Sequence, residues 1–165
     1  MSESSAAQSS GSDVVRYGVI GTGMMGVEHI QNIVHLDGSE VTAISDPYGP
    51  SRAAAIAEVT GAGRSAPAAF EHHGALLESG LVDAVVIATP NMTHVDVLGD
   101  VLATDVHVMV EKPLCTTVAD CQRVVDAAAA GPAVDRAPTP AADARVRPRR
   151  ARPSTTGGAC PARRR

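Results

Sequence analysis

A glycine-rich turn is the feature that most restricts the folds open to this chain. Residues 21–26 have the sequence GTGMMG. They follow the β-branched run VVRYGVIG at 14–21, and they open the segment GMMGVEHIQNIVHL at 23–36, whose aliphatic residues recur with helical spacing. A glycine pattern of this kind between a strand and a helix is typical of a turn that binds the phosphates of a dinucleotide.

Each glycine of this turn has its own predicted role. Gly21 allows the tight turn, Gly23 lets the backbone approach a pyrophosphate, and Gly26 lets the helix pack closely on the strand. The backbone amides of the turn and the dipole of the helix then hold the phosphates. The predicted cofactor-binding residues of the turn are Gly21, Thr22, Gly23, Met24, Met25 and Gly26.

Strand-like and helix-like segments alternate five times between residues 14 and 131. The short connections and the continuous apolar run DAVVIATP favour right-handed crossovers between parallel strands that helices cover on both faces. We therefore predict an α/β fold, a Rossmann-type doubly wound parallel sheet. The expected strands are 14–21, 40–45, a short strand near 64–65, 83–90 and 106–113, and the expected helices are 23–36, 51–61, one through 76 and 77, 92–105 and 116–131.

The composition changes at both ends of this predicted domain. Residues 1–13 have no apolar run, and residues 132–165 hold six prolines, eight alanines and nine arginines but only two large aliphatic residues. Neither segment can bury enough apolar surface to offset its ordering entropy. We expect a disordered lead at 1–13, a dinucleotide-binding domain at 14–131 and a disordered Arg/Pro/Ala-rich tail at 132–165.

Two interpretations of the tail remain open. Residues 1–131 carry five basic against sixteen acidic side chains, whereas the tail carries nine arginines against Asp135 and Asp143. A basic segment of this kind can bind nucleic acid or another anionic surface. Alternatively, the tail is GC-rich DNA translated out of frame, since the codons of Pro, Ala, Gly and most Arg begin with two G or C bases. We favour this frameshift hypothesis because the change is abrupt and falls at a helix end, which makes nucleic acid the less favoured partner.

An acidic residue follows the second predicted strand. Asp46 ends the run VTAISD and lies 20 residues after Gly26. An acid there accepts hydrogen bonds from the ribose hydroxyls of adenosine and repels a 2′-phosphate, which favours NAD over NADP. The next basic residue is Arg52, so nothing nearby clearly accommodates that phosphate. The alternative is an Asp that only shapes the turn before Pro47.

Two further polar motifs follow predicted strands. The sequence ATPNMTH ends the fourth strand, and EKP ends the fifth. Ligands bind at the carboxyl ends of the strands in open α/β sheets, so these residues are candidates for ligand contact, although solvated side chains and a helix-start histidine are the alternatives. The candidates are Thr89, Asn91, His94, Glu111 and Lys112, the last being the only lysine in the chain.

In this order and spacing, GTGMMG, Asp46, ATPNMTH and EKP resemble the N-terminal half of the Gfo/Idh/MocA oxidoreductases, a family that includes myo-inositol and glucose–fructose dehydrogenases. The resemblance covers about residues 14–131, and the pair ATPNxxH and EKP is its more specific part. It implies a Rossmann domain that binds NAD(H) or NADP(H), followed by a larger substrate domain.

The resemblance also implies roles for the residues of the two later motifs. Thr89, Asn91 and His94 are expected along the nicotinamide half of the cofactor. Glu111 and Lys112 are expected near the nicotinamide ribose, with Lys112 reaching the hydroxyl on the substrate carbon that loses its hydride. Lys112 is therefore the one predicted catalytic residue.

The chain departs from the family after residue 131. The family continues there with a sixth strand and a second domain that supplies acid/base residues and most substrate contacts, whereas this chain continues into the tail. We predict the nucleotide-binding half of an NAD-dependent sugar or polyol dehydrogenase, truncated, with little or no activity alone and without the family's oligomer interface. The alternative is a stand-alone NAD-binding sensor or partner subunit. A methyltransferase-type loop fits the glycines but not the other two motifs.

The remaining sequence features concern metals and location. Cys115, Cys121 and Cys160 have no zinc-type cluster around them, so no metal site is predicted. Their odd number and the lack of a secretory signal indicate free thiols in a reducing compartment. No stretch reaches the roughly 18 apolar residues that a membrane span needs. We therefore expect a cytoplasmic protein with a small-molecule substrate and no membrane partner.

Overall fold

The computed structural model describes residues 14–130 of the chain. Five strands within them form one sheet in the order β3-β2-β1-β4-β5, and every neighbouring pair is parallel. This is the predicted Rossmann-type α/β sheet. The disorder predicted at 1–13 and 132–165 lies outside the described residues. The strands are β1 (Val15–Ile20), β2 (Ser39–Ser45), β3 (Ala68–Phe70), β4 (Ala84–Ile87) and β5 (His107–Val110).

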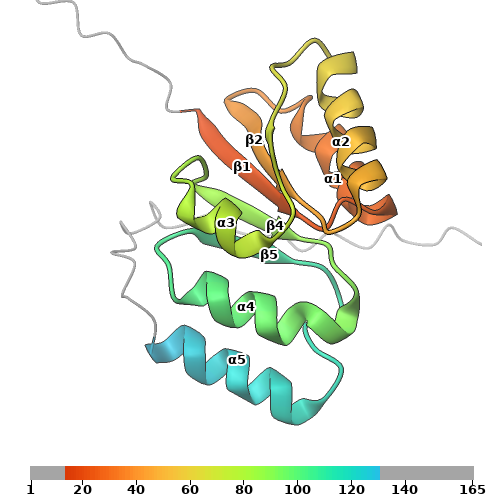
Figure 1. Ribbon diagram of the computed structural model, residues 1–165. Coiled ribbons are helices and arrows are strands. Elements are labelled where there is room, and N and C mark those ends of the chain that lie inside the picture. Colours follow the sequence, from red (N-terminus) through yellow and green to blue (C-terminus); the bar gives the residue numbers. More distant parts are fainter. Residues whose placement is uncertain (1–13, 131–165) are drawn as a thin grey trace, which may run out of the picture. The chain divides into compact units, whose positions relative to one another are not determined.

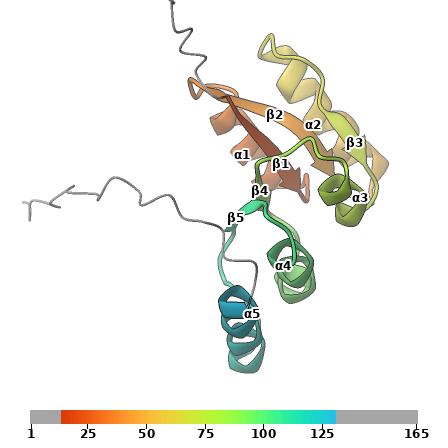
Figure 2. The ribbon, with the colours of Figure 1, turned by 90° about the vertical axis from the view of Figure 1, so that its left-hand side faces the viewer.

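Helices cover both faces of the sheet. Figure 1 shows α1 and α2 on one side of the strands and α4 and α5 on the other, and the turned view in Figure 2 separates the two groups. Consecutive residues of β1 belong to different cores on the two faces of the sheet. Val19 packs with α1 and α2, whereas Ile20 packs with α3, α4 and α5. The helices are α1 (Met24–Ile33), α2 (Gly49–Gly61), α3 (His73–Glu78), α4 (His94–Leu102), preceded by a 3-10 turn η1 (Asn91–Thr93), and α5 (Val118–Ala130).

The third strand is the element that the sequence placed wrongly. It was expected near 64–65, but β3 begins at Ala68 and pairs with the end of β2. The segment before it has another use: Gly63 has a φ of +75°, and the Arg64 guanidinium donates to the carbonyl oxygen of Val34 at 2.9 and 3.2 Å. These contacts turn the chain at the end of α2, so that the strand begins several residues later. The strand itself is too short to show a clear alternation of apolar and polar residues.

The order of the strands decides where a ligand can bind. The chain moves from β1 outward to β2 and β3, and then returns to place β4 on the other side of β1. At this reversal, the loops after β1 and β4 leave the sheet in opposite directions and open a crevice at its carboxyl edge. The glycine turn and the ATPNMTH motif therefore lie side by side, as the fold class requires.

An ion pair joins the opposite ends of the same two strands. One carboxylate oxygen of Asp83 accepts from the backbone amide and Nε of Arg16, at 2.9 and 3.1 Å, and the other lies 2.6 Å from an Arg16 terminal nitrogen. The side-chain hydrogen bonds from Arg16 and then the backbone hydrogen bond lower the pKa of Asp83 to about 2. This contact precedes β4 and aligns it with β1.

We predict that this pair makes stability depend on pH in the acid range. A carboxylate with a lowered pKa stabilises the fold above its ordinary pKa, and the contribution is lost as the pH falls from about 4 towards 2. Asp83→Asn should lower the melting temperature by a few degrees at pH 7, because the pair is partly exposed. Circular-dichroism melts at pH 7, 5, 4, 3 and 2.5 should show the difference shrinking. An equal difference at pH 7 and 2.5 would contradict the assignment.

Candidate functional site

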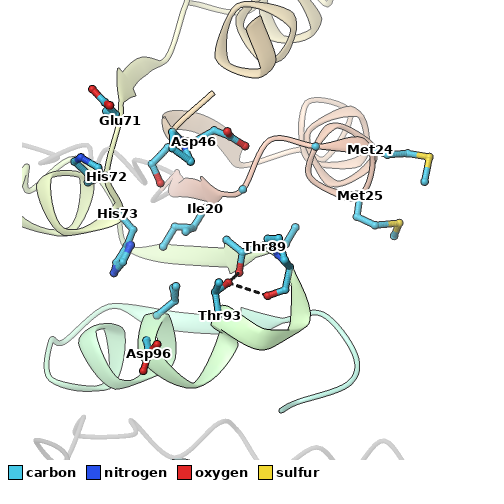
Figure 3. A pocket seen from close by; sticks show the side chains of 17 residues that line it. Ile20, Met24, Met25, Asp46, Glu71, His72, His73, Thr89, Thr93 and Asp96 are labelled. Carbon is cyan, nitrogen blue, oxygen red and sulfur yellow. Dashed lines mark hydrogen bonds between the residues drawn. The ribbon is translucent and has the colours of Figure 1, made fainter. Parts of the chain in front are cut away.

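A cavity of about 770 Å³ opens at the carboxyl edge of the sheet. This volume lies within the usual range of about 300–1,000 Å³ for small-molecule sites. The glycine turn after β1, the end of β2 and the loop after β4 all contribute to its lining (Figure 3). Among the predicted residues, it is lined by Gly21, Gly23, Met24, Met25, Asp46 and Thr89.

The three glycines of the turn do different things. Gly21 has a φ of +88°, and a Cβ on it would lie 2.7 Å from the carbonyl oxygen of Ala88. A Cβ on Gly26 would collide with the carbonyl oxygen of Gly21. A Cβ on Gly23 would meet nothing within 4 Å. The fold itself therefore requires Gly21 and Gly26, whereas the space in front of Gly23 is open to a ligand.

The start of α1 offers backbone donors to this space. The first helical hydrogen bond runs from the Val27 amide to the Gly23 carbonyl oxygen at 2.9 Å, so the amides before Val27 have no partner within the helix. No side chain caps this end, and no acidic residue lies in the first turn. Met24 is 85% exposed and Met25 39%, so neither side chain is packed against the rest of the protein at the start of the helix. An uncapped helix start of this kind attracts an anion through its amides and its dipole.

Two hydroxyl groups beside the turn also lack partners. Thr22 and Ser45 are each 2% exposed, and their side-chain oxygens have no hydrogen-bond partner among the described residues. Ser45 lines the cavity, at the end of the strand that precedes Asp46. Buried hydroxyls usually find a partner, so this corner has unused capacity for a polar ligand. The sequence patterns gave no signal for Ser45.

Asp46 fastens the glycine turn to the end of β2. One carboxylate oxygen accepts from the Thr22 amide and the other from the Tyr48 amide, both at 2.8 Å. The turn-shaping role that was the alternative is therefore present. A carboxylate has about four acceptor positions, so two amide contacts leave room for ribose hydroxyls. Arg52 also reaches this corner, because its guanidinium donates to the Asp46 carbonyl oxygen, a proximity that the linear sequence did not suggest.

The residues of ATPNMTH separate into three positions. Thr89 lines the cavity, and its hydroxyl lies 2.9 Å from the hydroxyl of Thr93, also a lining residue (Figure 3). Asn91 is exposed at the start of η1, outside the cavity lining. His94 is 0% exposed, with its two ring nitrogens 3.0 Å from the carbonyl oxygens of Thr89 and Pro113. The His94 ring is therefore enclosed between two loops and is not among the residues that line the cavity.

The EKP motif directly follows β5, the edge strand that lies next to β4. The Glu111 amide donates to the carbonyl oxygen of Ile87 at 2.9 Å, which is the last contact of the sheet on this side. The Glu111 carboxylate lies 2.7 Å from Nε2 of His29 on α1, and this hydrogen bond is the main cause that lowers the pKa of Glu111. Lys112 is exposed, precedes a cis peptide bond to Pro113, and lies outside the cavity lining.

The geometry agrees with the comparisons to known proteins. The family model described as "Oxidoreductase family, NAD-binding Rossmann fold" matches residues 15–134. The chain belongs to the Gfo/Idh/MocA family. It is thus an NAD-binding Rossmann domain of these oxidoreductases, as the resemblance implied.

Two relatives match this Gfo/Idh/MocA chain over 113 and 120 residues. The rhizopine catabolism protein MocA of Rhizobium meliloti is 34% identical over 113 residues, which are 68% of this chain and 33% of that protein. A glycosyl hydrolase family 109 protein of Shewanella sp. is 33% identical over 120 residues, which are 70% of this chain and 26% of that protein. The chain therefore spans about a third or less of the length of these relatives.

Solved structures show the same domain. Myo-inositol dehydrogenase from Lactobacillus casei, in complex with NAD(H) and myo-inositol, has a TM-score of 0.63 and 34% identity, with 69% of this chain and 33% of that chain covered. The WlbA dehydrogenase from Bordetella pertussis, in complex with NADH and UDP-GlcNAcA, has a TM-score of 0.61 and 31% identity, with 70% and 34% covered.

The cavity at the carboxyl edge of the sheet is also lined by residues that the sequence patterns missed. Glu71 and His72 line it from the loop between β3 and α3, His73 from the first position of α3, and Asp96 from α4 (Figure 3). The misplacement of β3 hid this loop, because only the true strand end brings it to the carboxyl edge. Within residues 14–130, no group of three or more His, Cys, Asp or Glu side chains could hold a metal ion, and no helix is long and apolar enough to cross a membrane.

We predict unequal losses of stability when alanine replaces two glycines of the turn. Gly26→Ala should destabilise the fold by about 1–3 kcal/mol or more, because its Cβ meets backbone that cannot move aside. Gly23→Ala should cost no more than about 1 kcal/mol, since its Cβ meets open space and only the helix cap changes. Urea unfolding of both variants measures the difference. Equal losses would show that the turn is packed differently.

Proposed function

We propose that residues 14–131 are the cofactor domain of an NAD-dependent oxidoreductase that acts on a secondary alcohol of a sugar or polyol. The observation that carries the proposal is the open start of α1 at Gly23, which shares one cavity with the carboxylate of Asp46. An anion-binding helix start beside a ribose-binding acid is the arrangement that a dinucleotide needs.

The cofactor would lie across the edge of the sheet. The amides before Val27 would hold the pyrophosphate, and Asp46 would accept from the adenosine ribose. Thr89 and Asn91 would accompany the nicotinamide half, while His94 would act from inside the protein by holding the loop of Thr89. The buried hydroxyls of Thr22 and Ser45 add polar capacity near the phosphates.

The chemistry would take place at the EKP end of this edge. Bound NAD supplies a nicotinamide ring that accepts a hydride from the alcohol carbon. The ammonium of Lys112 would orient the alcohol and stabilise the negative charge that develops on its oxygen. Glu111 would lie near the nicotinamide ribose. We place the group that accepts the hydroxyl proton outside residues 14–130, so that the region alone would bind cofactor but turn over little or no substrate.

The relatives support a polyhydroxylated substrate. The solved inositol dehydrogenase holds myo-inositol, and the WlbA dehydrogenase holds a nucleotide sugar derivative. Both substrates present hydroxyl-bearing rings, which fits a single lysine that recognises an alcohol rather than a particular ring.

The free thiols Cys115 and Cys121 support a reducing, cytoplasmic location.

A stand-alone NAD-binding subunit is the second candidate. The observation that favours it is that helices already cover both faces of the sheet, with two buried aliphatic cores inside residues 14–130. Such a region could fold and bind NAD without catalysis. Saturable NAD binding without turnover on sugars and polyols would support this candidate, whereas turnover by the purified chain would exclude it.

We predict that the full chain binds NADH and that Gly23→Ala weakens this binding by at least about tenfold, or about 1.4 kcal/mol. The added methyl group would occupy the space of the pyrophosphate without disturbing the fold. Isothermal titration calorimetry measures both affinities, with unfolding curves as the control for folded protein. A folded chain that binds no NADH, or an unchanged affinity in Gly23→Ala, would overturn the proposal.

We also predict that NADPH binds at least about tenfold more weakly than NADH. The reason is charge, because the carboxylate of Asp46 would lie beside the adenosine ribose and repel a 2′-phosphate there. Asp46→Asn should narrow the difference, since the amide removes the negative charge and Arg52 is already at this corner. Competition titrations with the two reduced cofactors measure the ratio. A ratio that stays the same in Asp46→Asn would assign the selectivity to other residues.

A further inference from the structure

We propose that His29 is a positioning residue for Lys112, and that it acts through Glu111. This inference rests on the proposed function, because it concerns the end of the site where the nicotinamide would lie. His29 belongs to none of the motifs in the sequence, and a histidine outside a motif is by default a surface or packing residue. The structure gives it a specific partner.

The first step of the argument is the pattern of contacts on Glu111. One of its carboxylate oxygens lies 2.7 Å from Nε2 of His29. The other accepts from the backbone amide of Lys112 at 3.2 Å. Both oxygens are therefore used, one towards α1 and one towards the lysine. A continuous hydrogen-bonded connection runs from the helix to the backbone of the residue whose amine would act on the substrate.

The second step is the environment of the pair. The side chains of His29 and Glu111 are only 19% and 22% exposed, so water competes weakly for this hydrogen bond. The hydrogen bond from His29 is also the largest cause of the lowered pKa of Glu111, which keeps the carboxyl group in its accepting, charged form. A contact of this kind is stronger than one between two exposed side chains.

The third step is the need for such a contact. β5 pairs with β4 along one edge, and no other described strand pairs with its second edge. The sheet contact of Glu111 with Ile87 is the last one before the chain leaves the strand. Beyond it, His94 holds the carbonyl oxygen of Pro113 from the other side. Lys112 therefore lies between two anchored neighbours, and His29 supplies the anchor that comes from α1.

The fourth step links the two ends of the site. α1 begins at the phosphate-binding turn and carries His29 less than two turns later. The same helix would thus hold the pyrophosphate by its first amides and the Lys112 loop by His29. If so, loss of His29 should affect the nicotinamide end of the cofactor and leave the adenosine diphosphate end untouched. A purely structural role would not separate the two ends.

The only lysine of the chain provides a local probe. Reductive methylation with ¹³C-formaldehyde labels the Lys112 amine and the N-terminal amine, whose resonances differ because the pKa values of the two amine types differ. We expect saturating NAD⁺ to shift the Lys112 resonance of the full wild-type chain, whereas saturating ADP leaves it in place. In His29→Ala, the NAD⁺-induced shift should fall below half.

Affinities complete the test. His29→Ala should weaken NADH binding by about tenfold and leave ADP binding within about twofold. Glu111→Ala should weaken NADH binding at least as much, because Glu111 would also lie near the nicotinamide ribose, and the double variant should be no worse than Glu111→Ala, since His29 acts only through this carboxylate. His29→Gln, which retains a side-chain N–H donor, should recover part of the loss. The matched control is His35→Ala, an exposed histidine just after α1 that should change nothing.

The outcomes separate this inference from the function on which it rests. If wild-type protein binds neither ADP nor NADH, the proposed function fails and the positioning role falls with it. If wild-type protein binds both, but His29→Ala weakens both equally or weakens neither, only the positioning role is overturned. If His29→Ala does not fold, the comparison of His29→Gln with Glu111→Gln decides, because loss of the Lys112 shift in a folded Glu111→Gln variant still supports the connection and an unchanged shift contradicts it.

Discussion

The structure depends on the close approach of the glycine turn to the loop after β4. Gly21 adopts a left-handed conformation in which its α-carbon faces the backbone of Ala88 and Thr89 so closely that no side chain would fit. Its amide donates to the Ser45 carbonyl oxygen at 2.8 Å, while the Ala88 amide donates to the Ile20 carbonyl oxygen at 2.8 Å. The backbone contacts around Gly21 therefore bring the ends of β1, β2 and β4 together. The cavity lies at the edge of the sheet where these three ends meet.

Asp46 transmits this constraint to the surface of the site. Its carboxylate accepts a hydrogen bond from the Thr22 amide and so holds the glycine turn next to the end of β2. In the proposed function the same carboxylate also meets the cofactor ribose, so the shape of the turn and the recognition of the cofactor would depend on one group. A substitution at Asp46 would therefore change the turn as well as cofactor binding. A substitution at Gly23 tests binding more directly, because a Cβ there meets no atom of the fold within 4 Å.

Much of the fold could be predicted because its signals are local. The glycine turn, the long apolar run of β4 and the helical spacing of α1 each lie within about fifteen residues, and their periods differ. The third strand could not be placed, since three residues give no period and the stretch before it is polar. Part of the candidate site followed in the same way, from the turn, Asp46 and Thr89. Ser45, Glu71 and His29 escaped because their roles arise only from contacts between distant segments.

The two histidines of the EKP region show how tertiary contact changes the meaning of a residue. In the sequence, His94 belongs to a motif and is predicted to bind the cofactor, whereas His29 belongs to none. In the structure both hold the same segment: His94 from α4 through the Pro113 carbonyl oxygen, and His29 from α1 through Glu111. α1 and α4 cover opposite faces of the sheet, so the loop that carries Lys112 is anchored from both layers. Lys112 is exposed just beyond the end of the edge strand β5, and under the proposed function this double anchorage would hold its backbone at a defined position.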